Sequence, residues 1–172
     1  MRRTAELGLM LALALILSYV ESMIPFSFGI PGIKLGLPNL IVLLLLYEKP
    51  NTGGEREALL VNVLRIVLSG FLFSNLYTIL YALAGAAFSF AAMAFGRRTK
   101  RFSMIGVSVL GGVFHNVGQL LVAMAVVETL AVAYYVPFLI VAGTVTGAVL
   151  GIAGTTLLPY LRRLEEEREQ RK

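Results

Sequence analysis

Residues 134–163 read YYVPFLIVAGTVTGAVLGIAGTTLLPYLRR, an apolar run with no charge until its last two residues. A helix needs about 20 apolar residues to cross the hydrocarbon core of a bilayer, and this run exceeds that length. Runs that are apolar on every side are typical of helices surrounded by lipid or by protein. The stretch therefore predicts a membrane-spanning helix that ends at a pair of cations.

Five further apolar segments precede this run. They cover residues 7–20, 37–47, 58–73, 76–95 and 104–127, and the last run covers residues 134–160. Only segment 37–47 is too short to cross a bilayer, so it either tilts and is capped by protein or continues back through residues 36–38. The chain is 58% hydrophobic and 15% charged, with a mean hydropathy of +0.81, too apolar for a soluble domain of 172 residues. We expect an all-α bundle of six transmembrane helices over residues 1–163 and a charged cytoplasmic tail over residues 164–172.

Lysine and arginine residues mark alternate connections between the segments. They are Arg2 and Arg3, then Lys49 and Arg56, then Arg97, Arg98, Lys100 and Arg101, and finally Arg162 and Arg163. Positive charge collects on the cytoplasmic side, so all four clusters predict one topology with both chain ends in the cytoplasm. The net charge of +5 thus indicates a multi-pass protein of the cytoplasmic membrane rather than a partner of nucleic acid. The tail is expected to extend the last helix, either as a solvated end or as a docking surface for a cytoplasmic partner.

Polar side chains inside the apolar segments each need a physical reason, because a charge at mid-membrane costs about 2.5–3.5 kcal/mol on insertion scales. Asn62 and Arg65 are three positions apart and share one helical face. Asn116 and Gln119 share a face in the fifth segment, and His115, the only histidine, lies one turn from Gln119. With the predicted orientation, these side chains lie toward the outer side of the membrane.

Two interpretations of this polar set are open. The functional one is a substrate pocket that opens outward between the third, fifth and sixth segments, under the loop around Lys34, where cations bind an anionic group and amides add directional hydrogen bonds. Its candidate residues are Lys34, Asn39, Asn62, Arg65, His115, Asn116 and Gln119. The structural one is that Arg65 bonds to helix carbonyls or pairs with Glu21 or Glu128, while the amides hold helices together.

Small residues recur at four-residue spacing in two segments. Gly143, Gly147 and Gly151 do so in the last segment, and Gly8 and Ala12, with Ala5 nearby, in the first. Such spacing lets helix backbones approach closely. The glycines of the last segment are expected to pack inside the bundle. The first segment fits either internal packing or contact with a partner protein.

The sequence lacks the residues that several kinds of enzymatic chemistry require. The sequence has no Gly-x4-Gly-Lys-Ser/Thr phosphate loop, and it contains no aspartate for a site that holds Mg²⁺ on a diphosphate. With no cysteine and one histidine, neither a disulfide nor a transition-metal site is expected. We expect a chain that is not an enzyme by itself and that uses no cofactor or metal.

Three stretches resemble the signature of the Gx transporter family, which also carries the name heptaprenyl diphosphate synthase component I. They are PGIKLGLPN at residues 31–39, EALLVNVLR at residues 57–65 and GVSVLGGVFHNVGQ at residues 106–119. That family is grouped with the S-components of energy-coupling factor (ECF) transporters, six-helix membrane proteins that capture vitamins or related micronutrients outside the cell. The resemblance implies a substrate-binding subunit for a small solute, anionic or isoprenoid-related.

The resemblance also implies partners. S-components dock on a transmembrane scaffold subunit driven by two cytoplasmic ATPase subunits, commonly through small residues of the first helix, for which Ala5, Gly8 and Ala12 are the candidates here. The missing phosphate loop agrees with this, since the partners would hydrolyse ATP. The competing hypothesis is a non-catalytic membrane accessory subunit of heptaprenyl or polyprenyl diphosphate synthesis, in which residues 97–101 and the tail hold a soluble enzyme.

Overall fold

The computed structural model describes residues 2–24, 36–48 and 53–170, and every regular element among them is helical. The elements are α1 (Arg2–Met23), α2 (Asn39–Glu48), α3 (Gly53–Phe73), α4 (Leu76–Thr99), α5 (Met104–Val127), the short 3₁₀ helix η1 (Leu130–Tyr135) and α6 (Val136–Gln170). The predicted all-α fold with six α-helices is confirmed. Helix α6 runs on through residues 164–170, so most of the predicted tail continues the last helix.

Within the described ranges, four helical stretches are long and apolar enough to cross a membrane, namely α1, α4, α5 and η1 with α6, and they indicate a membrane protein. Helix α3 has the length, but Arg56, Glu57 and Arg65 fall within every 18-residue stretch of it. Helix α2, with 10 residues, is about 15 Å long, half of the roughly 30 Å hydrocarbon core. Nearly every side chain of α2 is buried. Of the two expectations for segment 37–47, the structure therefore shows the helix capped by protein.

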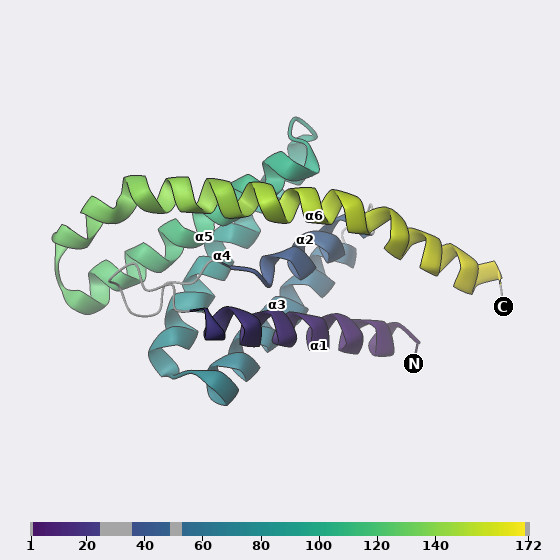
Figure 1. Cartoon of the computed structure of the whole chain (residues 1–172), viewed down its shortest axis with the longest axis horizontal. Helices are drawn as coiled ribbons and strands as arrows, with labels where there is room; N and C mark the ends of the chain where they lie inside the picture. Colours follow the sequence, from purple (N-terminus) through teal and green to yellow (C-terminus); the bar gives the residue numbers. More distant parts are fainter. Residues whose placement is uncertain (1, 25–35, 49–52, 171–172) are drawn as a thin grey trace.

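The helices form two groups that contact each other through α2, α3, α4 and α6. In one group α5 packs against both α4 and α6, and in the other α1 and α2 pack against α3. Helix α2 also contacts α6, and α3 contacts α4, so these two contacts join the groups. The apolar core is centred on α2, where Leu43, Leu45 and Leu46 are among the largest fully buried side chains. The two ends of the chain lie toward the same end of the molecule (Figure 1).

Glycines permit the close contact between α5 and α6. A Cβ atom at Gly112 would lie 2.3 Å from the backbone oxygen of Gly143, and one at Gly147 would lie 2.6 Å from the Cα atom of Val109. Gly151 meets the backbone of α5 in the same way. These contacts confirm that the glycines of the last segment pack inside the bundle.

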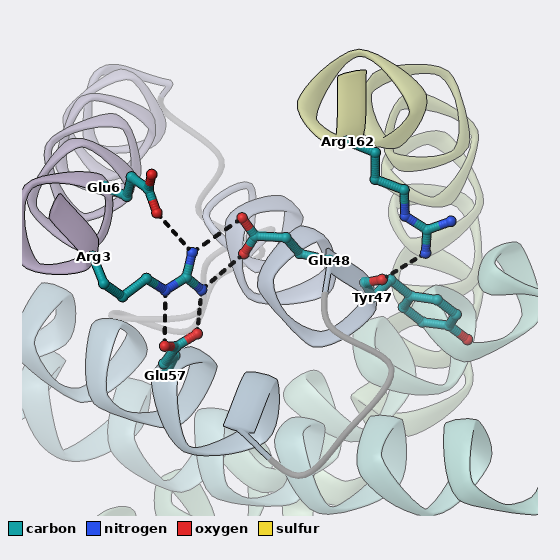
Figure 2. A network of polar contacts seen from close by, with 6 residues as sticks. All are labelled: Arg3, Glu6, Tyr47, Glu48, Glu57 and Arg162. Atoms are coloured by element: carbon teal, nitrogen blue, oxygen red, sulfur yellow. Dashed lines mark hydrogen bonds and ion pairs between the residues drawn. The ribbon is translucent and has the colours of Figure 1, made fainter. Parts of the chain in front are cut away.

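Charged side chains join three helices at the end of the bundle where the chain starts (Figure 2). Arg3 of α1 donates from Nε to Glu57 Oε1 of α3 at 2.8 Å, and from Nη2 to Glu48 Oε2 of α2 at 3.1 Å. Beside this group, Nη2 of Arg162 on α6 donates to the backbone oxygen of Tyr47 at 2.9 Å. One guanidinium thus holds the start of α1, the end of α2 and the first turns of α3 together.

Replacing Arg3 with alanine is expected to lower the free energy of unfolding by about 2 kcal/mol, because Glu48 and Glu57 would then lose the guanidinium that both of them bind. Breaking a fully buried pair costs about 3–5 kcal/mol, and the Arg3 side chain is 27% exposed. The measurement is unfolding of the purified protein in detergent. Arg56→Ala, which removes an exposed cation from the same end, is the control. Equal melting of Arg3→Ala and wild type would contradict this role of Arg3.

Candidate functional site

A set of polar side chains is buried among α1, α2, α3 and α5, each with less than a tenth of its surface exposed. The set is Ser18 and Glu21 on α1, Asn39 on α2, Asn62 and Arg65 on α3, and His115, Asn116 and Gln119 on α5. It includes all the residues predicted for the site except Lys34, which lies outside the described residues. Buried polar groups cost free energy unless they are hydrogen-bonded, so their contacts decide what the set can do.

Arg65 lies in the middle of α3 with 6% of its surface exposed. Its Nη2 donates to Asn62 Oδ1 at 2.7 Å, the contact that the three-residue spacing predicts, and its Nη1 reaches Ser18 Oγ at 3.5 Å. Glu21 interacts with the guanidinium electrostatically. Of the two acidic partners considered from the sequence, Glu21 is therefore the one that faces Arg65, whereas Glu128 is exposed at the end of α5.

Glu21 joins the end of α1 to the start of α2. Its Oε1 accepts hydrogen bonds from the backbone N–H groups of Gly36 and Leu37, the second at 3.2 Å. Gly36 has a φ of +82°, a left-handed conformation that glycine adopts without a steric cost. A carboxylate with two backbone donors and a guanidinium nearby is a fixed anion. Glu21 thus fixes the entry to α2 and places a negative charge near Arg65.

The turn at Gly36 brings Asn39 and His115 together. A Cβ atom at Gly36 would lie 2.9 Å from Asn39 Nδ2 and 3.5 Å from His115 Cδ2. The imidazole also lies against Gly85 of α4, where a Cβ atom would meet His115 Cε1 at 3.0 Å and Gln119 Cγ at 2.9 Å. A side chain at Gly85 would therefore displace the imidazole, so α4 shapes the site through a glycine.

Three buried polar atoms of the set have no hydrogen-bond partner among the described residues, namely Asn39 Oδ1, Arg65 Nε and His115 Nδ1. They come from α2, α3 and α5. Leaving a buried donor or acceptor unpaired costs about 1–3 kcal/mol. The Arg65 Nε–H group is a donor and Asn39 Oδ1 an acceptor, while His115 Nδ1 serves as either according to its tautomer. These atoms therefore offer one donor, one acceptor and one group of either kind.

Asn116 has a structural contact instead. Its Nδ2 donates to the backbone oxygen of Leu139 on α6 at 2.8 Å, so the amide fastens α5 to α6. The sequence suggested a pocket between the third, fifth and sixth segments. In the structure α1 and α2 also contribute, through Glu21 and Asn39, and α6 takes part through the Leu139 carbonyl.

Sequence analysis missed Ser18, Gly36 and Gly85 as parts of the site. Ser18 lies three residues before Glu21, so their common helical face was a signal that could have been used. The contacts of Gly36 and Gly85 join different helices and have no local signal. In the described parts of the chain, no three His, Asp or Glu side chains gather as ligands for a metal ion.

One side of α1 is open. Met10 and Ala14 are buried against the bundle, whereas Ala5, Gly8 and Ala12 are exposed. Nothing in the described part of the chain lies within 4 Å of a Cβ atom placed on Gly8. The small residues of α1 are therefore accessible to another helix.

The fold and the site define an all-helical membrane protein with a buried polar set between its helices. The chain belongs to the heptaprenyl diphosphate synthase component I family, whose sequence model matches residues 10–157. That range contains the whole buried polar set. A search of curated proteins found no match, and neither did a search of solved structures.

Proposed function

We propose that the chain is the substrate-binding, S-component-like subunit of an ECF-type uptake transporter and is not itself an enzyme. It would lie in the cytoplasmic membrane with six membrane-inserted helices and both ends in the cytoplasm, as the positive charges of alternate connections favour. The observation that carries the proposal is a group of polar atoms on Asn39, Arg65 and His115, buried on three helices, with no hydrogen-bond partner among the residues that the structure describes.

The chemistry of these atoms favours a small solute with an acidic or other electron-rich oxygen. Such an oxygen would accept from Arg65 Nε, and a hydroxyl or amide of the same solute would donate to Asn39 Oδ1. Because Glu21 already neutralises part of the Arg65 charge, the solute needs no more than one negative charge. Apolar surroundings on α2 and α5 would suit an isoprenoid-related or vitamin-like body.

The proposed partners are a transmembrane scaffold subunit and two ATPase subunits. Helix α1 would dock on the scaffold through its open side at Ala5, Gly8 and Ala12, where small residues allow close helix contact. ATP hydrolysis by the partners would then rock the bundle in the membrane and release the solute inside. No cofactor or metal is needed for this role.

A ligand of the site is expected to raise the melting temperature of the wild type by several degrees and to leave Arg65→Ala unchanged. At a hundredfold excess over Kd the stabilisation is about 2.7 kcal/mol. The probes are panels of small carboxylates, phosphates, vitamins and isoprenoid alcohols, tested by thermal shift in detergent. Ser69→Ala, one turn from Arg65 on the same helix, is the control and should respond like the wild type. If no probe stabilises the wild type, or Arg65→Ala responds equally, the proposal fails.

A second candidate function is a membrane accessory subunit for polyprenyl diphosphate synthesis, which the family name favours. In that case the cytoplasmic end, including residues 97–101 and the end of α6, would hold a soluble prenyltransferase. Affinity purification of the full chain from its native membrane distinguishes the transport function from the accessory function. A scaffold protein and ATPases support transport, and a prenyltransferase without them supports the accessory role.

A further inference from the structure

A groove on the surface of α4 and α5 is lined by aromatic side chains. Its volume is about 380 Å³, and its walls include Phe88 and Phe95 of α4, Phe102 and Phe114. These are four of the ten phenylalanines in the chain, and each is between 41% and 66% exposed. None of the buried polar set lines the groove, so it is a separate site.

The groove extends to the turn that joins α4 to α5. Phe102 belongs to that turn and lies close to both helices, since Cβ atoms placed on Gly96 and Gly106 would come within 3.8 Å and 3.5 Å of it. Lys100 and Arg101 directly precede Phe102, and both are exposed. The backbone of Lys100 is fixed, because its N–H donates to the Arg97 oxygen at the end of α4. Two exposed cations therefore directly precede, along the chain, the phenylalanine at one end of the aromatic groove.

These two cations pair with no carboxylate of the described residues, unlike Arg97 and Arg98 at the end of α4. Nη1 of Arg97 lies 3.6 Å from Glu55 Oε1, and Arg98 Nε donates to that oxygen at 3.0 Å. The hydrogen bond from Arg98 keeps the pKa of the Glu55 carboxyl below its usual value, so this pairing holds at neutral pH. Lys100 and Arg101 are left to bind an anion from outside the chain.

We infer that this groove binds an anionic phospholipid of the surrounding bilayer, with an acyl chain along the four phenylalanines and the phosphate at Lys100 and Arg101. Any lipid chain can cover an apolar surface, so selectivity comes from the two cations, whose charge complements the phosphate. The site rests on the proposed orientation, which places this turn at the cytoplasmic surface, where anionic lipids gather. It does not depend on what the buried polar set binds.

A single introduced tryptophan can report on the groove, because the chain has none of its own. The Phe95→Trp protein is placed in phosphatidylcholine vesicles that contain, at equal mole fraction, either dibrominated phosphatidylglycerol or dibrominated phosphatidylcholine, whose bromines quench tryptophan fluorescence on contact. We expect an apparent affinity about 25-fold higher for phosphatidylglycerol, since each of the two juxtamembrane cations contributes about fivefold and the two factors multiply. Lys100→Asn with Arg101→Gln should remove this preference, and asparagine suits the left-handed backbone at position 100.

Phe71→Trp is the control, at an exposed phenylalanine of α3 that does not line the groove, and both lipids should quench it equally. Should Phe95→Trp fail to fold, Phe102→Trp reports on the same groove. Equal quenching by the two lipids at the groove would overturn the inference, and so would a preference that survives the loss of both cations. Displacement of the bromolipid by a polyprenyl phosphate at lower concentration than by unbrominated phosphatidylglycerol would also overturn it, because the groove would then be an isoprenoid site.

Discussion

Gly112→Leu is expected to prevent formation of the bundle, so that the variant is recovered only as aggregated protein. A Cβ atom at this position would lie 2.3 Å from the backbone oxygen of Gly143, and a helix backbone cannot rotate away as a side chain can. Overpacking of an ordinary core costs about 1–3 kcal/mol, and forcing two helix backbones apart exceeds that range. Size-exclusion chromatography and thermal unfolding in detergent measure the effect.

Gly8→Leu is the matched control, because nothing in the described part of the chain lies near its added side chain. This variant should elute and melt like the wild type. The proposed scaffold subunit should no longer co-purify with this variant. A loss of co-purification with normal melting would distinguish an effect on assembly from an effect on folding. A Gly112→Leu protein that melts normally would contradict the close packing of α5 on α6.

Glu21→Leu is expected to lower the free energy of unfolding by about 3 kcal/mol, because it removes the carboxylate that interacts electrostatically with the buried Arg65 guanidinium. The change also removes the acceptor for the backbone N–H groups of Gly36 and Leu37 at the start of α2. Denaturant unfolding of the purified protein, followed by circular dichroism, gives the free energy.

The double variant Glu21→Leu with Arg65→Met tests the electrostatic interaction itself. Replacing two buried opposite charges by apolar residues costs much less than removing one of them, so the double variant should recover part of the stability lost in Glu21→Leu. A double-mutant cycle with Arg65→Met measures the coupling. Strictly additive losses would show that Glu21 and Arg65 do not stabilise each other.

The helices could be predicted because apolar runs and their lengths are local features of a sequence. Runs 76–95 and 104–127 correspond to α4 (Leu76–Thr99) and α5 (Met104–Val127), with the same starting residues. Helix α2 shows what apolar runs cannot predict. A run of leucines is equally apolar whether protein or lipid surrounds it, so the sequence does not distinguish the two surroundings. Helix α3 shows the reverse case, in which charges that pack inside the protein lower the hydropathy of a long helix.

Part of the candidate site could be predicted in the same way. The hydrogen bond between Asn62 and Arg65 follows from their spacing on one helix. The contacts of Glu21 at the start of α2 could not be predicted, because they depend on how α1 packs after an intervening connection. Asn116 has a residue type that suits ligand binding, yet its amide joins α5 to α6, and only the packed structure shows this.

Native mass spectrometry of gently purified wild type and Arg65→Met, both checked for equal folding, tests the proposed binding function most directly. We predict that the wild type carries a small molecule whose mass is absent from Arg65→Met, because the ligand would lose its charge-assisted contact with the guanidinium. A wild type with no bound small molecule after growth in complete medium, or the same ligand at equal occupancy on both proteins, would contradict the assignment of the buried polar set as a substrate site.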